Sequence, residues 1–298
     1  MEKLNVGLVS KTYFYVSYWA ALQRGMFSAA GLDVHSVMLG NASQIEPLET
    51  GRLDVAMATP EGVLQNTAAG GRVRCIAGHT GRLSHFIIAQ PRFRKIEDLR
   101  GALVGILSMT EGTFFHVQSV LAAHGLKYPD DYQVKETGGA PPRHKALIEK
   151  TIDMGFQSIP LAYAEESLGF SNLGDVSDYV PDWQFNTVNA HLDRAGARRD
   201  AVTRFLRVML EANGWVYENR VEAAAVAARE MDISQEHAER GWDYYTGKGV
   251  LTRNLEMNLK GLARVIESQR SAGLLPREAS SDPQAYMAGE FLNAARSK

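Results

Sequence analysis

Short apolar runs alternate with amphipathic segments along the first two thirds of the chain. The runs predict buried strands, and the segments between them predict helices. Strands that alternate with helices are typical of largely parallel sheets that helices cover on both faces. The predicted strands are 4–9, 34–39, 54–58, 73–79, 86–89, 103–107, 132–136 and 153–157. Predicted helices include 60–69, 142–150 and 160–169.

The pattern changes after residue 198, where only helices are predicted, with breaks near Asn219, Asp232, Gly247 and Gly273. A chain of 298 residues is long enough for two domains. We therefore expect an α/β fold of two doubly wound lobes, joined by two crossover strands near residues 86 and 185. The predicted lobe 1 comprises residues 1–86 and 186–298, which include the helical C-terminal tail, and lobe 2 comprises residues 87–185.

One local pattern occurs twice, at residues 48–60 and 147–160. Each copy contains a helix end, a turn with an aspartate, an apolar strand, a hydroxyl residue and a proline. Thr59 and Ser158 are the predicted N-caps of the helices that follow, with the prolines in the first turn. A strand that leads into a capped helix start is where an open α/β sheet holds its ligand. Two copies predict two similar lobes around one cleft.

Composition adds few restrictions. The chain is 45% apolar and 22% charged, with a net charge of -2, so no global field favours nucleic acid. The single cysteine, Cys75, excludes an intrachain disulfide and a cysteine-based zinc site, and its apolar neighbours predict a buried strand residue. No phosphate-binding or dinucleotide-binding fingerprint and no nucleophile elbow follows a strand. We predict no cofactor and no metal.

No stretch of 18 consecutive apolar residues predicts a membrane span, and we expect no membrane insertion. No basic segment followed by an apolar one precedes the first predicted strand. The sequence as written predicts a cytoplasmic protein, whereas trimming of an export signal would make it periplasmic. We expect a monomer.

The order of several segments resembles the type II periplasmic-binding-protein fold. It is most similar to the NMT1/THI5-like and SsuA-like substrate-binding proteins of ABC transporters, a branch with sulfonate, nitrate, taurine and thiamine-pyrimidine binding proteins. Members usually carry a leader and a Ser/Gly-rich loop in lobe 2, whereas this chain lacks the first and has Glu111 in the second. The matching segments are 19–27, 30–34, 51–56, 95–105, the segment around Asp153 and the helical tail.

This resemblance implies two lobes that close by hinge bending on a small molecule, which is then passed to an ABC permease. It also implies that the ligand contacts loops at the carboxyl ends of the strands. Carried over to this chain, the candidate ligand-binding residues are Tyr13, Phe14, Tyr15, Asn41, Ser43, Thr59, Glu61, Arg82, His85, Ser108, Thr110, Glu111, Thr113, Ser158, Trp183 and Asn186.

Most of these residues have two interpretations. Ser108, Thr110 and Thr113 either bind a carboxylate or sulfonate, or only cap a helix. Glu61 and Glu111 either bind an amine or hydroxyl of the ligand, or only complement a helix dipole.

The segment 78–85 has basic side chains beside the first crossover. Arg82 is a candidate clamp for a carboxylate, and His79 and His85 are candidates to position it or carry a proton. The alternative is a solvated hinge loop, and two histidines six residues apart without a third ligand do not indicate a metal site.

Aromatic residues are expected at the mouth of the cleft. Three successive aromatics at 13–15 are hard to bury in a loop, so they favour a flat or apolar organic ligand over a bare inorganic anion. Trp183, Phe185 and Phe114 are expected beside them, although Phe114 also fits an ordinary core position.

Three functions are compatible with these features. The first is a solute-binding protein for a small organic acid such as an aromatic carboxylate, a sulfonate or a pyrimidine. The second is a cytoplasmic enzyme similar to a thiamine-pyrimidine synthase or a decarboxylase, with Glu61, Glu111, His79 and His85 as its catalytic candidates. The cysteine-rich motif of the synthase is absent, because Cys75 stands alone. The third is a ligand sensor, for which no output domain is recognisable. We favour the binding protein.

Overall fold

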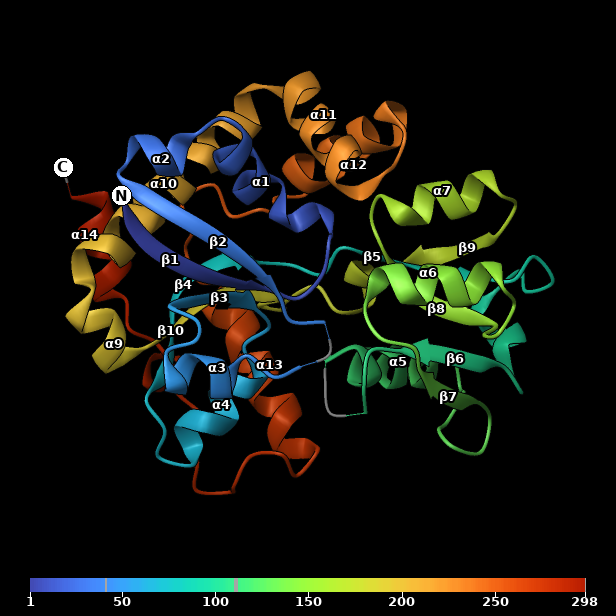
Figure 1. Ribbon diagram of the computed structural model, residues 1–298. Helices are drawn as coiled ribbons and strands as arrows, with labels where there is room; N and C mark the ends of the chain where they lie inside the picture. Colours follow the sequence, from blue (N-terminus) through green and yellow to red (C-terminus); the bar gives the residue numbers. More distant parts are fainter. Residues whose placement is uncertain (41, 110–111, 298) are drawn as a thin grey trace.

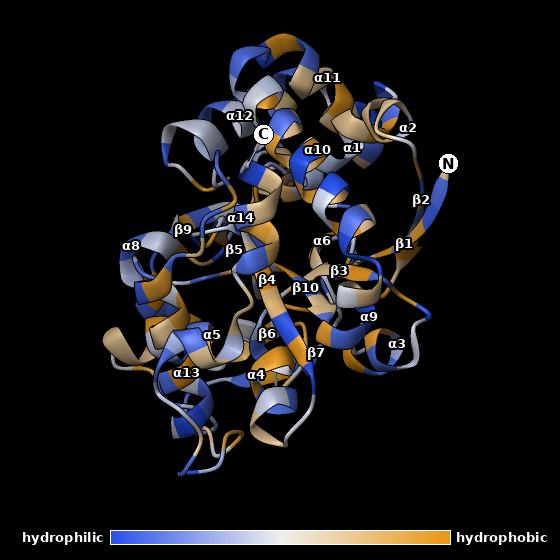
Figure 2. Cartoon of the chain, turned by 90° about the vertical axis from the view of Figure 1, so that its left-hand side faces the viewer, coloured by the Kyte–Doolittle hydropathy of each residue, from blue (hydrophilic) through white to orange (hydrophobic). Residues whose placement is uncertain are grey.

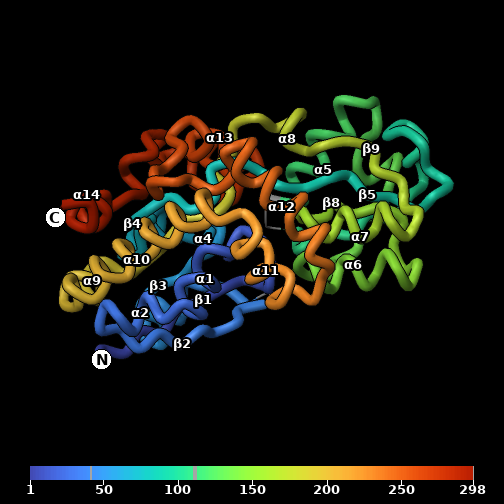
Figure 3. The backbone as a smooth tube through the Cα atoms, turned by 90° about the horizontal axis from the view of Figure 1, so that it is seen from above, coloured from blue at the N-terminus to red at the C-terminus, as the bar shows by residue number. Residues whose placement is uncertain are grey.

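The computed structural model describes residues 1–40, 42–109 and 112–297 of the chain. Two five-stranded sheets each form the centre of one lobe, and the lobes lie side by side (Figures 1 and 3). Both chain termini lie on the first lobe. The fold therefore has the expected two α/β lobes.

The first sheet has the spatial order β2-β1-β3-β10-β4, and the second has the order β7-β6-β8-β5-β9. The strands of the first are β1 (Glu2–Leu8), β2 (Leu32–Met38), β3 (Val55–Ala58), β4 (Val73–Thr80) and β10 (Asn186–His191). Those of the second are β5 (His85–Ala89), β6 (Leu103–Ile106), β7 (Gln133–Glu136), β8 (Met154–Ser158) and β9 (Ser171–Asp175).

The two sheets have the same plan. In each, a central strand pairs in parallel with two neighbours: β1 with β2 and β3, and β6 with β7 and β8. The fourth strand arrives from the other lobe and runs antiparallel, β10 beside β3 and β5 beside β8. In each sheet four strands run in the same direction and one runs against them, so the sheets are mixed but largely parallel, as expected. Strand β9 was not predicted, whereas β10 begins where the second crossover strand was expected, near residue 185.

Helices cover both faces of each sheet, and Figure 2 shows hydrophilic and hydrophobic residues alternating along them. In the first lobe they are α1 (Val16–Gln23), α2 (Met26–Ala29), α3 (Ile45–Thr50), α4 (Glu61–Ala68), α9 (Leu192–Ala197), α10 (Arg199–Glu218), α11 (Arg220–Met231) and α14 (Glu290–Arg296). In the second they are α5 (Gly112–Ala123), α6 (Ala140–Ile148), α7 (Leu161–Ser167) and α8 (Val176–Tyr179). The remaining elements are α12 (Gln235–Gly247), α13 (Leu259–Ser271) and the 3-10 helices Tyr13–Tyr15, Ile96–Leu99 and Pro283–Tyr286.

The chain passes between the sheets at residues 81–84 and 176–185, and the buried side chain of Gln184 joins these two crossovers. Its Nε2 donates hydrogen bonds to the carbonyl oxygens of Thr80 at 3.1 Å and Asn186 at 2.8 Å. Its Oε1 accepts one from the backbone N–H of Asn258 at 2.7 Å. One side chain thus holds both connections and the start of α13 together.

Helix α12 of the C-terminal tail also contacts both lobes. The Tyr245 hydroxyl donates to Ile159 O at 3.2 Å and lies 2.8 Å from the Ser84 hydroxyl. Arg240 forms an ion pair with Glu166 of α7 at 3.3 Å. The tail therefore packs across the region where the lobes join, as well as on the first lobe.

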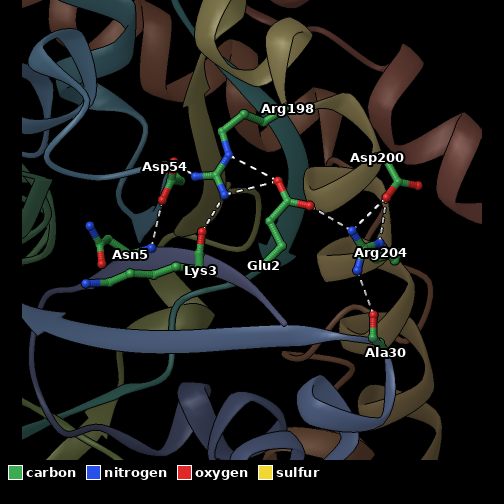
Figure 4. Close-up of polar contacts among 8 residues, drawn as sticks. All are labelled: Glu2, Lys3, Asn5, Ala30, Asp54, Arg198, Asp200 and Arg204. Carbon is green, nitrogen blue, oxygen red and sulfur yellow. Dashed lines mark hydrogen bonds and ion pairs between the residues drawn. The ribbon is translucent and has the colours of Figure 1, made fainter.

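A charged network fixes α10 to the start of β1 in the first sheet (Figure 4). Glu2 of β1 forms ion pairs with Arg198 at 3.2 Å and with Arg204 at 2.8 Å. Arg198 also pairs with Asp54, whose other oxygen accepts a hydrogen bond from the Asn5 backbone at 2.8 Å. A network of partly buried charges is a stronger link than an isolated surface pair.

The predicted helix caps are wrong in detail. Pro60 and Pro160 themselves occupy the N-cap positions of α4 and α7, so the preceding Thr59 and Ser158 are not N-caps. Ser43 is not an N-cap either, because Gln44 is the N-cap of α3 and makes no side-chain capping bond. The side chains of Thr59 and Ser158, which the sequence assigned to helix capping, therefore lie beside the cleft between the lobes. In the described part of the chain, no helix is long and apolar enough to span a membrane.

Candidate functional site

A small cavity lies between the lobes, where strands of both sheets end. Its walls come from the loops after β1, β3, β6 and β7, from the end of β8 and from α5 and α6. The starts of α4, β5 and β10 and the second crossover complete them. The side chains leave about 50 Å³ in it, and a buried water needs roughly 10–15 Å³ on the same measure. Two more open grooves of about 300 and 580 Å³ adjoin it. The lining residues are Val9, Ser10, Thr12, Phe14, Thr59, Glu61, His85, Leu107, Thr113, His116, Gly139, Ala140, Arg143, Ser158, Phe185 and Asn186.

The only arginine among the lining residues is Arg143, in the first turn of α6, and its side chain is 2% exposed. It lies across the second sheet, over two strand glycines. A Cβ on Gly155 would be 2.8 Å from Arg143 Cδ, and one on Gly105 would be 3.3 Å from Arg143 Cγ. The two glycines therefore leave the space through which the arginine reaches the cavity.

Arg143 has fewer partners than a buried guanidinium needs. One of its terminal nitrogens donates to Gly138 O at 3.2 Å, while its Nε has no hydrogen-bond partner among the described residues. Burial lowers the pKa of Arg143 to about 10, and the nearby Glu165 carboxyl opposes this shift. A buried cation of this kind is stabilised by an anion that occupies the cavity.

Three further polar side chains in the cavity wall have spare hydrogen-bonding capacity. The hydroxyls of Thr12 and Ser158 and the Oδ1 atom of Asn186 are buried and have no partner in the part of the chain that the structure describes. Thr12 follows β1, Ser158 ends β8 and Asn186 begins β10. Two lobes thus supply hydroxyl donors beside one arginine, which suits the several oxygens of an acid group.

Two buried histidines complete the polar wall. Burial, together with the charges of Arg143 and His116, holds the pKa of His85 well below its usual value. Burial lowers the pKa of His116 to about 3. The His85 ring meets Phe185 edge to face at 5.1 Å, and the His116 ring meets Trp183 in the same way at 4.3 Å. Both histidines are therefore neutral in the free protein at neutral pH.

One buried carboxyl group also faces the cavity. Glu61, the first residue of α4, is 1% exposed. With Arg143 it gives the cavity one acidic and one permanently basic group. A ligand with an acid group and a neighbouring hydroxyl or amine would find a partner for each.

The structure brings seven of the predicted site residues to the cavity wall: Phe14, Thr59, Glu61, His85, Thr113, Ser158 and Asn186. Ser43 and Ser108 line the groove of about 300 Å³, which shares Thr59 with the cavity. Trp183 lines the groove of about 580 Å³, which shares His116 with it. Asn41, Thr110 and Glu111 lie outside the described residues.

Tyr13 and Tyr15 lie in the hydrophobic core and not in the cavity wall, which corrects their expected place. Their hydroxyls donate to the carbonyl oxygens of Ala238 at 2.9 Å and Met57 at 2.5 Å. The burial of Tyr13 and Tyr15 was unexpected because a buried phenol hydroxyl needs a hydrogen-bond partner. The C-terminal tail and β3 provide these partners. Only Phe14 of the three aromatics reaches the cavity.

His79, Arg82 and Phe114 also lie away from the cavity wall. The His79 Nε2 donates to Phe14 O at 2.5 Å, so this histidine supports the loop that carries Phe14. Arg82 lies on the first crossover and is not among the lining residues. Phe114 packs edge to face on Tyr128 at 5.3 Å in the core of the second lobe.

Sequence reasoning missed Arg143, His116 and Thr12. A usable signal existed for Arg143, since a basic residue in the first turn of a helix opposes the helix dipole. Such a residue needs another reason for its position. His116 and Thr12 carried no comparable signal in the sequence. Among the described residues, no group of three His, Cys, Asp or Glu side chains could hold a metal ion.

The fold and this cavity define a two-lobed ligand-binding protein of the periplasmic-binding-protein class. The NMT1/THI5 like family model matches residues 12–223, which is more than half of the chain, and the protein belongs to that family. A protein of Brucella abortus (strain 2308), named as a putative binding protein, is 25% identical over 300 residues, which cover 94% of this chain and 90% of that protein.

Solved structures are similar over nearly the whole length. The alkanesulfonate-binding protein SsuA from Xanthomonas axonopodis pv. citri, bound to MOPS, has a TM-score of 0.77 and 16% identity, and covers 97% of this chain and 99% of its own. The nitrate-binding protein NrtA from Synechocystis PCC 6803 has a TM-score of 0.78 and 12% identity, with 99% and 88% covered. At these identities the similarity establishes the fold.

Proposed function

We propose that this protein is the substrate-binding component of an ABC-type uptake system, and that it binds a small organic acid between its lobes. Arg143 is the observation that carries the proposal, because it is a buried cation facing a cavity with spare hydroxyl donors. An acid group would accept hydrogen bonds from the Arg143 guanidinium, whose Nε has no partner among the described residues.

The shape of the site supports a compact acid group with an organic remainder. A cavity of about 50 Å³ admits little more than the acid group itself. The adjoining grooves of about 300 and 580 Å³ have room for the rest of the ligand. Phe14 and Phe185 give the cavity apolar walls, which favour an organic acid over an inorganic anion.

The named relatives support the class of function. SsuA is an alkanesulfonate-binding protein and NrtA a nitrate-binding protein, so the same fold serves anion binding in both. We propose the same role for this chain, with an ABC permease as its partner. We do not propose the enzyme alternative, because the named relatives are binding proteins and His79 supports the loop that carries Phe14.

A binding experiment tests this function. Thermal unfolding is followed with methanesulfonate, benzoate and an aminopyrimidine, for the natural chain, Arg143→Gln and the control Arg277→Gln. Arg277 is exposed on the C-terminal tail. At a ligand concentration of about 100 Kd, at least one acid should stabilise the natural chain and the control by about 2.7 kcal/mol. The same acid should leave Arg143→Gln unchanged. Equal stabilisation of all three proteins, or of none, would contradict the proposal.

A further inference from the structure

His116 is a buried base that the proposed acid-binding role does not yet use. It lies on α5, is 5% exposed, and lines both the cavity and the groove of about 580 Å³. Its Nε2 atom is buried and has no hydrogen-bond partner among the residues that the structure describes. The imidazole is therefore placed where a bound ligand would arrive.

The cavity side of His116 carries three other titratable groups: His85, Arg143 and Glu61. Before a ligand binds, the nearby buried carboxyl of Glu165 already offsets part of the positive charge of Arg143. An incoming acid adds a second negative charge to a site with one permanent positive charge. In a water-poor cavity an unbalanced charge is costly, so binding favours a second positive charge close by.

The groove side of His116 does not already provide that charge. Arg264 pairs with Glu267 at 3.0 Å, and Asp182 pairs with Lys260 at 2.6 Å. Arg264, Glu267 and Lys260 are largely exposed, Asp182 is 29% exposed, and all four charges are already matched.

His116 is better placed than His85 to become the second positive charge. Arg143 and His116 both disfavour a charge on His85, whereas burial alone disfavours one on His116.

We propose that this protein takes up one proton on His116 when it binds its organic acid. The acid group then lies between the Arg143 guanidinium and the His116 imidazolium, whose Nε2–H donates to it. This inference rests on the proposed function. It adds that the natural ligand is bound as a fully ionised acid together with a proton, so affinity depends on pH even for a strong acid.

Isothermal titration with methanesulfonate tests the inference, because this acid stays ionised and any proton taken up must reside on the protein. Titrations at about pH 6.5 use two buffers with different ionisation enthalpies. The difference in observed heat then gives the number of protons taken up. We expect up to one proton per methanesulfonate, and a Kd that rises about tenfold per pH unit where uptake is complete.

The variants assign the proton. His116→Gln should bind with no proton uptake, and the exposed His35→Gln should behave like the natural chain. Binding without uptake by the natural chain, or uptake that persists in His116→Gln and disappears in Glu61→Gln, would overturn the inference and leave the proposed function intact. Absence of methanesulfonate binding at about pH 6.5, together with no stabilisation by benzoate or the aminopyrimidine, would instead contradict the proposed function.

A measurement on the natural chain avoids dependence on the folding of a variant. The ring C–H resonances of the histidines are followed by NMR from about pH 5 to 8, with and without methanesulfonate. The His116 resonance should titrate only in the complex. The same neutral state of His116 with and without bound methanesulfonate would overturn the inference.

Discussion

The side chain of Arg143 passes directly over Gly155, where an added Cβ would lie 2.8 Å from Arg143 Cδ and 3.0 Å from Cγ. Real Cβ atoms essentially never approach a neighbour within 3.0 Å, so any larger residue at 155 must displace the arginine. A glycine in the interior of a strand often marks such a close approach. The sheet itself thus sets where the guanidinium can reach.

Gly155→Ala should therefore weaken the binding of an organic acid at least tenfold, because it moves Arg143 away from the cavity. Overpacking should also lower the free energy of unfolding by about 1–3 kcal/mol. Binding is measured by titration calorimetry, and stability by urea unfolding. Gly214→Ala in α10 is the matched control, since no neighbour lies within 4 Å of the added Cβ. Unchanged affinity in Gly155→Ala would contradict this placement of Arg143.

Arg143→Met should make the free protein more stable while it abolishes acid binding. Methionine keeps the apolar stem over the glycines and removes a buried charge whose Nε has no partner among the described residues. Removing the charge also removes its desolvation penalty, which is several kcal/mol for a buried ion in a protein. Thermal unfolding without ligand measures the gain. An Arg143→Met protein that is less stable than the natural chain and still binds the organic acid would contradict this prediction.

The buried His79 should make the fold sensitive to acid. Burial lowers the pKa of His79 to about 4, below its usual 6.5, so the unfolded chain binds the proton more readily. This histidine contributes stability above pH 6.5, and the contribution falls by about 1.4 kcal/mol per pH unit as the pH drops towards 4.

His79→Gln should reduce that slope, because glutamine does not titrate and its side-chain N–H can still reach Phe14 O. The free energy of unfolding is measured by urea titration between about pH 4 and 7. His35→Gln is the control, since His35 is about half exposed and its variant should keep the natural slope. Parallel pH profiles for the natural chain and His79→Gln would be incompatible with a neutral, buried His79.

Gln184→Ala should strongly destabilise the protein, because it removes three hydrogen bonds between the two crossovers and α13. The backbone groups of Thr80, Asn186 and Asn258 would lose a buried partner, and we expect a loss of about 2–4 kcal/mol. Gln133→Ala on β7 is the control, where a single exposed hydrogen bond is removed. Equal stability of the two variants would show that Gln184 does not hold the crossovers together.

The two-lobed plan could be predicted because the local pattern occurs twice. The copies that end in Thr59 and Ser158 lie at equivalent points of the two lobes, and both reach the same cavity. Their assigned role as N-caps was wrong, because a proline occupies each N-cap and cannot be distinguished by spacing from a first-turn proline. The exact lobe boundaries at residues 86 and 185 stay a prediction.

The missed features depend on contacts between distant segments. Strand β10 joins the first sheet only after the chain has built the second lobe, so no local pattern marks its antiparallel direction. The burial of Tyr13 depends on the carbonyl of Ala238, which is 225 residues away. Arg143 enters the cavity because Gly105 and Gly155 lie beneath it on separate strands. Contacts between residues so far apart in the sequence leave no periodic pattern from which they could be predicted.

A crystal structure of the protein with bound methanesulfonate tests the central claim most directly. The account predicts the sulfonate in the cavity between the lobes, with an oxygen about 2.7–3.0 Å from Arg143 Nε and another near the Ser158 hydroxyl. A sulfonate bound elsewhere on the protein, with Arg143 making no contact to it, would contradict the account.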